Sequence, residues 1–408
     1  MRQKFAKLFI YFGLVHLIFV LIHFIYDFNG MKIFKIGKSA LADISFNDFH
    51  YREVHSKIKH DGKNDYLLHY KDHKYPKEVC LVNIADLPDS NFRSEFIHLI
   101  ERLQGFGPKV VGVDITFDSS LPLSKEIQEL GTNYSNMVWA QKNKNDLAGK
   151  IDFGPQNMGF TRLITDTKTI RKYSSSTKSF ANRLVRKAYP KIKIKPLDDE
   201  VFNIHYNSLE NGMVRYDLVN DPLIEYNYHY IPASDIMDTS MMDMNILMSL
   251  DSELKDMVVI VGYLGQEGRR SYDVEDKWCT PTDVNNMVQR DPLMYGSVIH
   301  ANAFNNILHE DSRYAEWSGW PFVLITNLLL LGFIAFLIFF HYPKIVNIAL
   351  VTLLTLPMLY LAVKFMEYGI YISVGATVLH IIVIEEIVEV IDPFYNAISK
   401  RFKLIFKR

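Results

Sequence analysis

Aspartates and glycines at the ends of apolar segments are the residues in this sequence best placed to do chemistry. Asp86 and Asp114 each close a run of apolar residues, and Gly262 and Gly265 lie at the end of a third run. In open α/β sheets, ligands bind in the crevice at the carboxyl ends of the parallel strands. We therefore expect these carboxylates and glycines to line one crevice.

Further polar residues are candidates for the same crevice. The complete candidate set for ligand binding is Asp86, Asp114, Asp118, Gly262, Gly265, Thr280, His300 and Asn302. Paired carboxylates can act as general acid and base or hold a divalent cation. Aspartates at strand ends also cap helices and fix loops by accepting backbone N–H groups. Three roles therefore stay open for this set: structure, ligand contact and catalysis.

Motifs for a catalytic nucleophile or a metal centre do not occur in the 408 residues: there is no Gly-x-Ser-x-Gly, no His-Glu-x-x-His and no phosphate loop. We therefore predict no catalytic residue, no metal and no cofactor, and we do not expect an enzyme. The formal net charge of −1 gives no field that favours nucleic acid. Cys80 and Cys279 can form a disulfide in an oxidising compartment, or remain two separate small apolar residues.

The elements that must position these residues follow from hydrophobic patterning. Segments 78–86, 109–117 and 257–263 are short apolar runs typical of buried strands. Apolar residues at helical spacing lie between the first two runs, and this strand–helix–strand order indicates parallel strands. A further helix is expected at 298–308. The predicted fold class is an α/β extracytoplasmic domain with a mainly parallel sheet.

The middle of the predicted domain is less regular. Residues 179–189 have a helical pattern, and residues 191–195 and 226–230 alternate as edge strands do. Residues 141–197 carry 14 Lys/Arg against 3 Asp/Glu, whereas residues 198–256 carry 2 against 13. The basic segment can form a face for an anionic ligand, or the two segments can be solvated faces that partly neutralise each other.

Four apolar runs predict four α-helical transmembrane spans, one N-terminal and three C-terminal. We place them at residues 8–26, 317–340, 345–364 and 368–391. Basic residues flank the first and last runs, which puts the N-terminus (1–7) and the basic tail (392–408) in the cytoplasm. Residues 27–316 then form one extracytoplasmic domain. The first run is expected to be an uncleaved anchor, because no small-residue cleavage site follows it.

Acidic residues near the end of the last run have two interpretations. Glu385, Glu386 and Glu389 follow its most apolar part. Either the helix continues into the membrane interface there, or these carboxylates belong to an ion path.

An ordered series of segments gives the sequence its family resemblance. The segments are Val82–Asp86, Gly107–Phe117, Leu254–Gly262, Asp276–Pro281 and Tyr295–Ala303. Their series resembles the second type of CHASE domain, CHASE-2, an extracellular sensory domain of bacterial signalling proteins. The order of the segments, their spacing and the three apolar runs after the domain all fit that family.

The resemblance implies a sensor of the bacterial inner membrane, with its large domain in the periplasm or extracytoplasmic space. In that family the domain usually precedes a histidine kinase, a nucleotide cyclase or a protein kinase, whereas the tail after the last predicted span is too short for one. We therefore expect the chain to lack its own output domain and to pass ligand or envelope state to a separate signalling or envelope protein. A small-molecule or anionic ligand and an oligomer are both compatible with the sequence.

Two other functions stay open at this point. One is a structural or assembly subunit of an envelope complex, in which the spans only anchor the domain. The other is an extracytoplasmic enzyme that uses the Asp86 and Asp114 carboxylates.

Overall fold

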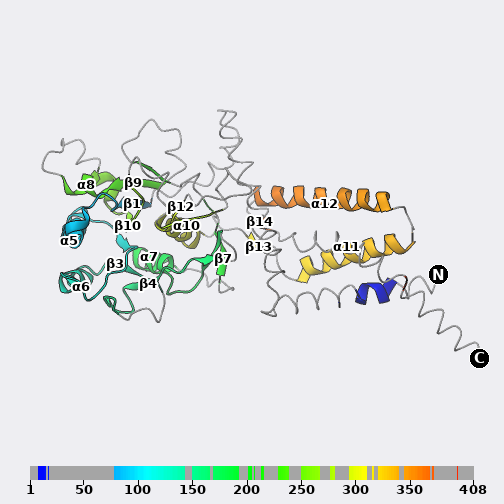
Figure 1. The fold of residues 1–408 in the computed structure, drawn as a ribbon, viewed down its shortest axis with the longest axis horizontal. Coiled ribbons are helices and arrows are strands. Elements are labelled where there is room, and N and C mark those ends of the chain that lie inside the picture. The colour runs from blue at the N-terminus through cyan, green and yellow to red at the C-terminus, as the bar shows by residue number, and fades with distance from the viewer. Residues whose placement is uncertain are drawn as a thin grey trace, which may run out of the picture. The chain divides into compact units, whose positions relative to one another are not determined.

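A computed structural model describes most of the predicted domain and part of the predicted spans (Figure 1). The described residues are 8–14, 17, 78–142, 149–165, 169–192, 201–204, 206, 213–215, 228–238, 250–266, 276–280, 294–309, 315–316, 320–339, 344–367, 370–371 and 393. The chain divides into two compact units. One is Tyr51–Tyr314, and the other combines Met1–His50 with Ala315–Arg408.

The unit Tyr51–Tyr314 is built on a seven-stranded sheet in which every neighbouring pair of strands is parallel. Its strands are β1 (Val79–Asn83), β2 (Val110–Val113), β3 (Met137–Gln141), β4 (Met158–Phe160), β8 (Met213–Arg215), β9 (Tyr228–Pro232) and β10 (Val258–Gly262). The strand order is β4-β3-β2-β10-β1-β9-β8. The predicted α/β class with a mainly parallel sheet is confirmed.

The three strands at the centre of the sheet are those that the sequence predicts. Every residue of β1, β2 and β10 is buried, because helices cover both faces of a parallel sheet. The order differs from a simple strand–helix–strand pair, since β10 lies between β1 and β2. Val259 of β10 pairs with Cys80 on one side and with Val111 on the other.

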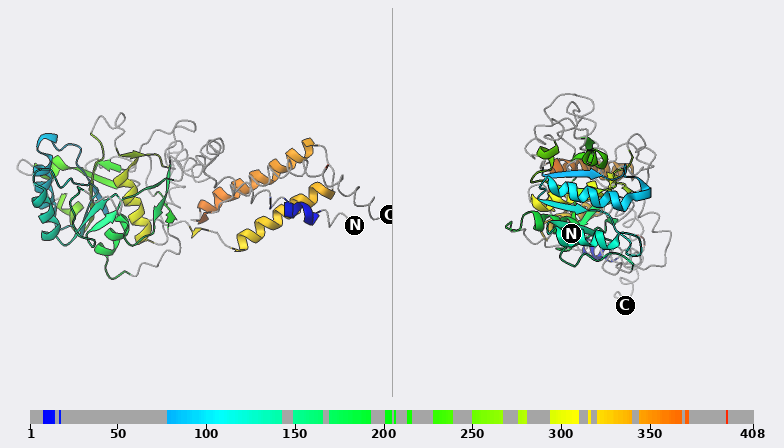
Figure 2. Two further views of the ribbon diagram at one scale, coloured as in Figure 1. Left: turned by 60° about the horizontal axis from the view of Figure 1, so that its bottom comes forward. Right: turned by 90° about the vertical axis from the view of Figure 1, so that its left-hand side faces the viewer.

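Helices pack on both faces of the sheet, as Figures 1 and 2 show. One face holds α5 (Phe92–Gly105), α6 (Ser124–Asn133) and α8 (Ala233–Met237), and the other holds α7 (Phe180–Ala188) and α10 (Gly296–Leu308). Successive residues of a strand point to opposite faces. Cys80 and Val82 accordingly join the core under α5, and Leu81 joins the core under α7 and α10. The helices predicted at 179–189 and 298–308 are confirmed by α7 and α10.

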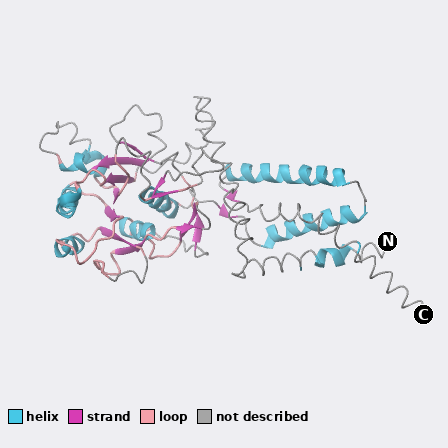
Figure 3. Ribbon diagram, in the orientation of Figure 1, coloured by secondary structure: helices cyan, strands magenta, loops and turns pink. Residues whose placement is uncertain are grey.

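Smaller elements complete this unit (Figure 3). An antiparallel sheet joins β5 (Ile164–Thr165), β6 (Ile170–Ser174) and β7 (Val201–Asn203), and a second joins β11 (Lys277–Trp278) and β12 (Met294–Tyr295). A 3-10 helix, η1 (Asp89–Asn91), precedes α5.

Three details of this unit bear on the sequence predictions. Cys80 and Cys279 are both buried and are not joined to each other, so they do not form the disulfide that the sequence left open. Of the predicted strand 191–195, residues 191–192 lie in a turn and the others fall outside the described residues. The alternating segment 226–230 overlaps β9, which begins at Tyr228.

The other unit contains two long helices, α11 (Trp320–Phe339) and α12 (Lys344–Glu367). They coincide with the second and third predicted spans, and residues 8–14 of the first are also helical. Within the described residues, no helix combines the length and the apolar character that crossing a membrane requires. The four spans therefore stay a prediction.

The start of the fourth predicted span differs from a helix. Ile370–Tyr371 forms β14, which pairs in parallel with β13 (Ala315–Glu316). A β-branched and an aromatic residue favour extended backbone, which suits this pairing. The remainder of that span, including Glu385, Glu386 and Glu389, lies outside the described residues.

Candidate functional site

The carboxyl end of β10 is a topological switch point of the sheet. The chain leaves β1 and β2 toward α5 and α6 on one face, whereas the chain after β10 reaches α10 on the other. Such points are where open α/β sheets form their crevices. Asp114 follows β2 directly, and its backbone N–H donates to the carbonyl oxygen of Val261 at 2.8 Å. Its side chain is thereby fixed beside the end of β10.

Two residues from the start of α10 face Asp114. Ser297 donates its hydroxyl to Oδ2 of Asp114 at 2.8 Å, and Nε2 of His300 lies 3.7 Å from Oδ1. The side chains of Asp114 and His300 are only 10% and 2% exposed. A buried polar cluster therefore joins β2 and β10 to α10, in addition to apolar packing.

Tyr173 extends this cluster on the far side of the His300 ring. Its hydroxyl lies 2.7 Å from Nδ1 of His300 and accepts the backbone N–H of Ala181 at 3.3 Å. Burial raises the pKa of Tyr173, so the phenol stays protonated. Its O–H therefore donates the hydrogen bond to Nδ1 of His300. The remaining proton of the neutral ring is then on Nε2, which faces Asp114.

Asp276 brings a second carboxylate to the start of α10. It has a left-handed backbone with φ 52°, and its carbonyl oxygen accepts the N–H of Gly296 at 3.1 Å. A methyl group added at Gly296 would lie 2.9 Å from Oδ2 of Asp276, so the carboxylate rests against the first residue of the helix. The N-terminus of a helix favours negative charge, which opposes the effect of burial on this carboxyl.

The ionisation of these groups is strongly perturbed. Burial raises the pKa of Asp114 to about 6, although the hydrogen bond from Ser297 opposes the shift. The pKa of Asp276 is also raised to about 6, first by burial of its carboxyl and then by the charge of Asp114. Asp276 as a whole residue remains exposed, whereas the side chain of Asp114 is only 10% exposed. Burial lowers the pKa of His300 to about 4.

The two candidate glycines have structural roles at this switch point. A Cβ on Gly262 would lie 2.0 Å from Oγ of Ser297, so only glycine allows α10 to approach the strand this closely. Gly265 has φ +75°, and its carbonyl oxygen accepts the side-chain amide of Asn83 at 2.9 Å. Asn83 in turn accepts the N–H of Leu264 at 2.9 Å, which ties the loop after β10 to the end of β1.

Asp86 lies in a different place, a groove of about 640 Å³ at the carboxyl ends of β1, β8 and β9. The groove is lined by Asn83, Ala85, Asp86, Leu87, Pro88, Asp89, Arg215, Pro232, Ser234, Asp235 and Gln266. Oδ2 of Asp86 accepts the N–H of Ser234 at 2.8 Å. Asp114 does not line this groove, since β10 separates β1 from β2, so the expected single crevice with both carboxylates is not formed.

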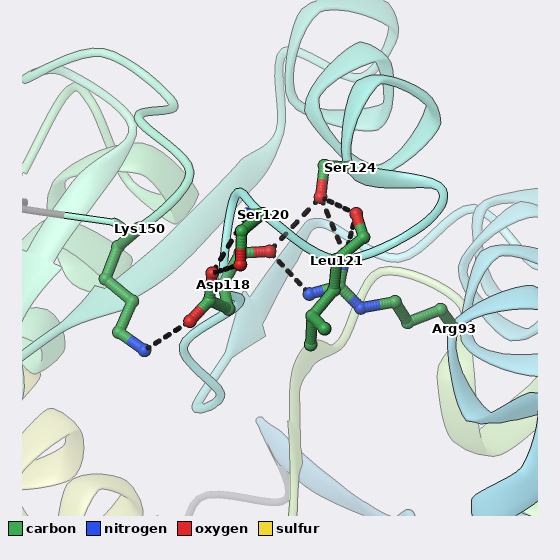
Figure 4. Close-up of polar contacts among 6 residues, drawn as sticks. All are labelled: Arg93, Asp118, Ser120, Leu121, Ser124 and Lys150. Atoms are coloured by element: carbon green, nitrogen blue, oxygen red, sulfur yellow. Dashed lines mark hydrogen bonds and ion pairs between the residues drawn. The ribbon is translucent and has the colours of Figure 1, made fainter.

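Asp118 has a third location, in the loop between β2 and α6 (Figure 4). Oδ1 of Asp118 accepts the N–H and the hydroxyl of Ser120 at 2.9 and 2.7 Å, and these bonds hold its pKa below the usual range. Lys150 lies 3.7 Å from its other oxygen. Arg93 of α5 donates to the carbonyl oxygen of Asp118 at 2.6 Å. Asp118 thus fixes a loop.

Thr280 and Asn302, the last two candidates, are both buried. Thr280 follows β11, and Asn302 lies within α10, where its side-chain amide donates to the carbonyl oxygen of Val298 at 2.9 Å. Within the described residues, no group of three or more His, Cys, Asp or Glu side chains is arranged to hold a metal ion.

Sequence reasoning missed three members of the buried cluster. Ser297 sits between Gly296 and a later histidine of the same helix, and small residues there signal a close helix–strand approach. Asp276 starts a segment used for the family resemblance, which gives it a signal by position. Tyr173 lies in β6, outside the parallel sheet, and nothing in the sequence links it to His300.

Comparison with known families gives one match that spans most of the chain. The model of the CHASE2 domain matches residues 65–338. That range includes all seven strands of the parallel sheet, together with Asp114, Asp276 and His300. Searches of curated proteins and of solved structures found no similar chain.

Proposed function

The chain belongs to the CHASE2 family of extracellular sensor domains, and on that premise we propose that it is a sensor anchored in the bacterial inner membrane. In this proposal residues 27–316 face the extracytoplasmic space, and the domain passes its state to a separate signalling partner. A binding role fits the buried cluster better than a catalytic one, because Asp114, Ser297 and His300 are engaged with one another and largely shielded from solvent.

The observation that carries the proposal is the polar attachment of α10 to the centre of the sheet. Every residue from Gly296 to Ile307 is buried, including Ser297, His300 and three asparagines. Buried polar groups are costly unless they are hydrogen-bonded, so such a helix has few acceptable positions. A change at the cluster therefore shifts α10 between discrete arrangements, which is the property that a sensor needs.

In this proposal a shift of α10 is passed on to α11, the helix that follows it in the sequence and belongs to the predicted membrane part. α10 ends at Leu308 and α11 begins at Trp320, so the connection is short. Because each residue of an extended chain spans at most about 3.6 Å, this connection has little slack to absorb a movement of α10. Leu328, Leu353 and Leu361 on α11 and α12 are exposed apolar side chains, which suits helices that contact lipid. Together with the basic flanks of the apolar runs, they support a multi-pass anchor.

The groove beside Asp86 is the place that we propose for a small polar ligand. It combines the Asp86 carboxylate with an ion pair between Arg215 and Asp235, whose atoms lie 3.0 Å apart. A ligand acts on the sensor only through a difference in affinity between two states of the domain. Replacing Asp86 with Ala is then expected to abolish a ligand response while the domain stays folded.

The test of the proposed function is to uncouple α10 from α11. A flexible Gly-Ser insert between Tyr314 and Ala315, ahead of β13, is introduced into the full chain, and the same insert between Lys144 and Asn145 is the control. Solubilised membranes are then used to recover the partner and measure its activity at equal expression. We expect the first insert to uncouple the partner's activity from the domain and the control to preserve it. Equal activity in both would make the spans passive anchors and would favour an assembly subunit instead.

Topology is tested independently with reporter fusions. Fusions at Gly131 and after Arg408 are expected to report opposite sides of the membrane, because the positive-inside rule places only the tail in the cytoplasm. Reporters on the same side would contradict the extracytoplasmic domain.

A further inference from the structure

We propose that the cluster of Asp114, Asp276 and His300 at the start of α10 is a proton-binding site through which the domain responds to the pH outside the cytoplasm. The inference rests on the proposed sensor function and names its stimulus. Its geometric basis is that two carboxylates and an imidazole from three separate segments converge on the first turns of one buried helix.

The described neighbours of the two carboxylates do not neutralise them. Asp114 faces Ser297 and His300 of α10, and Asp276 faces Gly296 and receives the indole N–H of Trp278 at 3.4 Å. The end of β10 contributes only Gly262, which has no charge. Among the described residues, no lysine or arginine forms an ion pair with either carboxylate. The two negative charges therefore repel each other across the start of the helix.

In the part of the chain that the structure describes, the other groups around the cluster are neutral or engaged elsewhere. β6 contributes the Tyr173 hydroxyl, and α7 contributes the Phe180 ring, 5.2 Å from the His300 ring. The cation that β11 contributes is Lys277, whose Nζ lies over the Tyr295 ring at 5.3 Å. Protonation of one carboxylate is thus the simplest way to relieve the repulsion.

The pKa values support this order of protonation. The pKa values of Asp114 and Asp276 are raised to about 6, whereas that of His300 is lowered to about 4. Histidine is ordinarily the side chain that takes up a proton near pH 6. Here burial keeps the imidazole neutral, so the first proton goes to a carboxylate.

The direction of the structural response follows from linkage. A carboxyl whose folded-state pKa is raised is stabilised in its protonated form by the native packing. Acidification through about pH 6 therefore tightens the contact between α10 and the sheet. A rise in pH ionises both carboxyls and loosens the start of the helix. The domain thus has two states that differ in bound protons at the helix next to α11 in the sequence.

The experiment is hydrogen–deuterium exchange of the full chain in detergent, from about pH 5 to about pH 8, corrected for the intrinsic pH dependence of exchange. The reporter peptide covers 294–308. We expect its protection to increase as the pH falls, with a midpoint near 6 in the native chain. Asp114→Asn should abolish most of this transition. Ser297→Ala should shift its midpoint upward by about one pH unit, because it removes the hydrogen bond that favours the ionised carboxylate.

Asp118→Asn is the matched control, since it changes an exposed carboxylate of the same strand-end loop and should leave the transition intact. Absence of a transition in the native chain, or an unchanged transition in Asp114→Asn, would overturn the proposal. If Asp114→Asn does not fold, the midpoint of Ser297→Ala decides, and an unmoved midpoint counts against the site. Loss of the pH transition with partner coupling intact removes only the proton site. A transition without any partner coupling removes the sensor function instead.

Discussion

Ser297 and Asp114 are 183 positions apart in the sequence and are joined by a hydrogen bond of 2.8 Å. The bond connects the first turn of α10 to the residue that follows β2, across the end of β10. Gly262 leaves the room for it. The contact between α10 and the sheet therefore depends on the hydrogen bond between Ser297 and Asp114 and on the absence of a Cβ at Gly262. Each can be altered separately by substitution.

Replacing Gly262 with Ala should destabilise the domain. The added methyl group would lie 2.0 Å from Oγ of Ser297, which forces α10 away from the strand. Overpacking of this kind costs about 1–3 kcal/mol. Urea unfolding of the purified chain measures the effect. Gly105→Ala is the control, because nothing lies within 4 Å of a Cβ there. Equal stability of the two variants would show that the helix yields without cost.

Asp114→Asn should stabilise the folded chain at neutral pH. The folded-state pKa of Asp114 is raised from 3.8 to about 6, so its stabilising contribution is present below the unfolded pKa and is lost as the pH rises through 6. The amide mimics the protonated carboxyl, and the gain at pH 7 is on the order of 1–3 kcal/mol. Unfolding free energies measured from about pH 4 to about pH 8 should show a flatter profile than in the native chain.

The control for this effect is Asp118→Asn, because the pKa of Asp118 is shifted in the opposite direction, downward. Hydrogen bonds from Ser120 lower the pKa of Asp118, so its contribution is present at neutral pH and is lost as the pH falls. The amide should therefore not stabilise the chain at neutral pH. A gain in both variants would point to a general effect of charge removal rather than to the buried cluster.

Tyr173→Phe should destabilise the domain by about 1–3 kcal/mol. The change leaves Nδ1 of His300 and the N–H of Ala181 buried without the hydroxyl that now serves both. Urea unfolding at neutral pH measures the loss. Tyr134→Phe removes the hydroxyl of a tyrosine that is only partly buried, and it should have little effect. If Tyr173→Phe is as stable as the native chain, water replaces the hydroxyl, contrary to its buried position between His300 and Ala181.

Arg93→Lys should loosen the loop between β2 and α6. Arg93 donates to the carbonyl oxygens of Asp118 and Pro122 at 2.6 and 2.8 Å and to the hydroxyl of Ser124 at 2.8 Å. Lysine keeps the charge and loses the fork that reaches several acceptors. Hydrogen exchange of residues 118–124 should increase several-fold, whereas Lys125→Ala, an exposed neighbour, should not change it. No increase in Arg93→Lys would show that the charge alone is enough.

The three central strands and the helices α5, α7 and α10 were predictable because their signals are local, whereas β3, β4 and β8 were not predicted. The apolar runs that became β1, β2 and β10 are continuous, as strands buried on both faces require. The order of these strands was not predictable. All three are equally apolar, so no residue marks β10 as the strand that separates β1 from β2. The prediction that Asp86 and Asp114 share a crevice failed for this reason.

The candidate site was predictable only in part. Asp114, Gly262 and His300 are brought together by the switch point, as the general rule for open sheets suggests. Ser297 and Tyr173 were missed because their roles depend on contacts across long stretches of sequence. Asp118 was assigned to the crevice because it follows a strand closely. In the structure its carboxylate accepts hydrogen bonds from Ser120 of its own loop instead.

The position of β10 also governs how the domain can fold. β1 and β2 appear early in the chain, but they do not pair with each other, and the strand that fills the space between them is the last of the sheet to be synthesised. Until it arrives, two apolar strands present unpaired edges, which are the regions most prone to aggregation. Folding that waits for such distant contacts is slow. The growing chain would then need protection of these edges, such as a chaperone provides, until Gly262 has been synthesised.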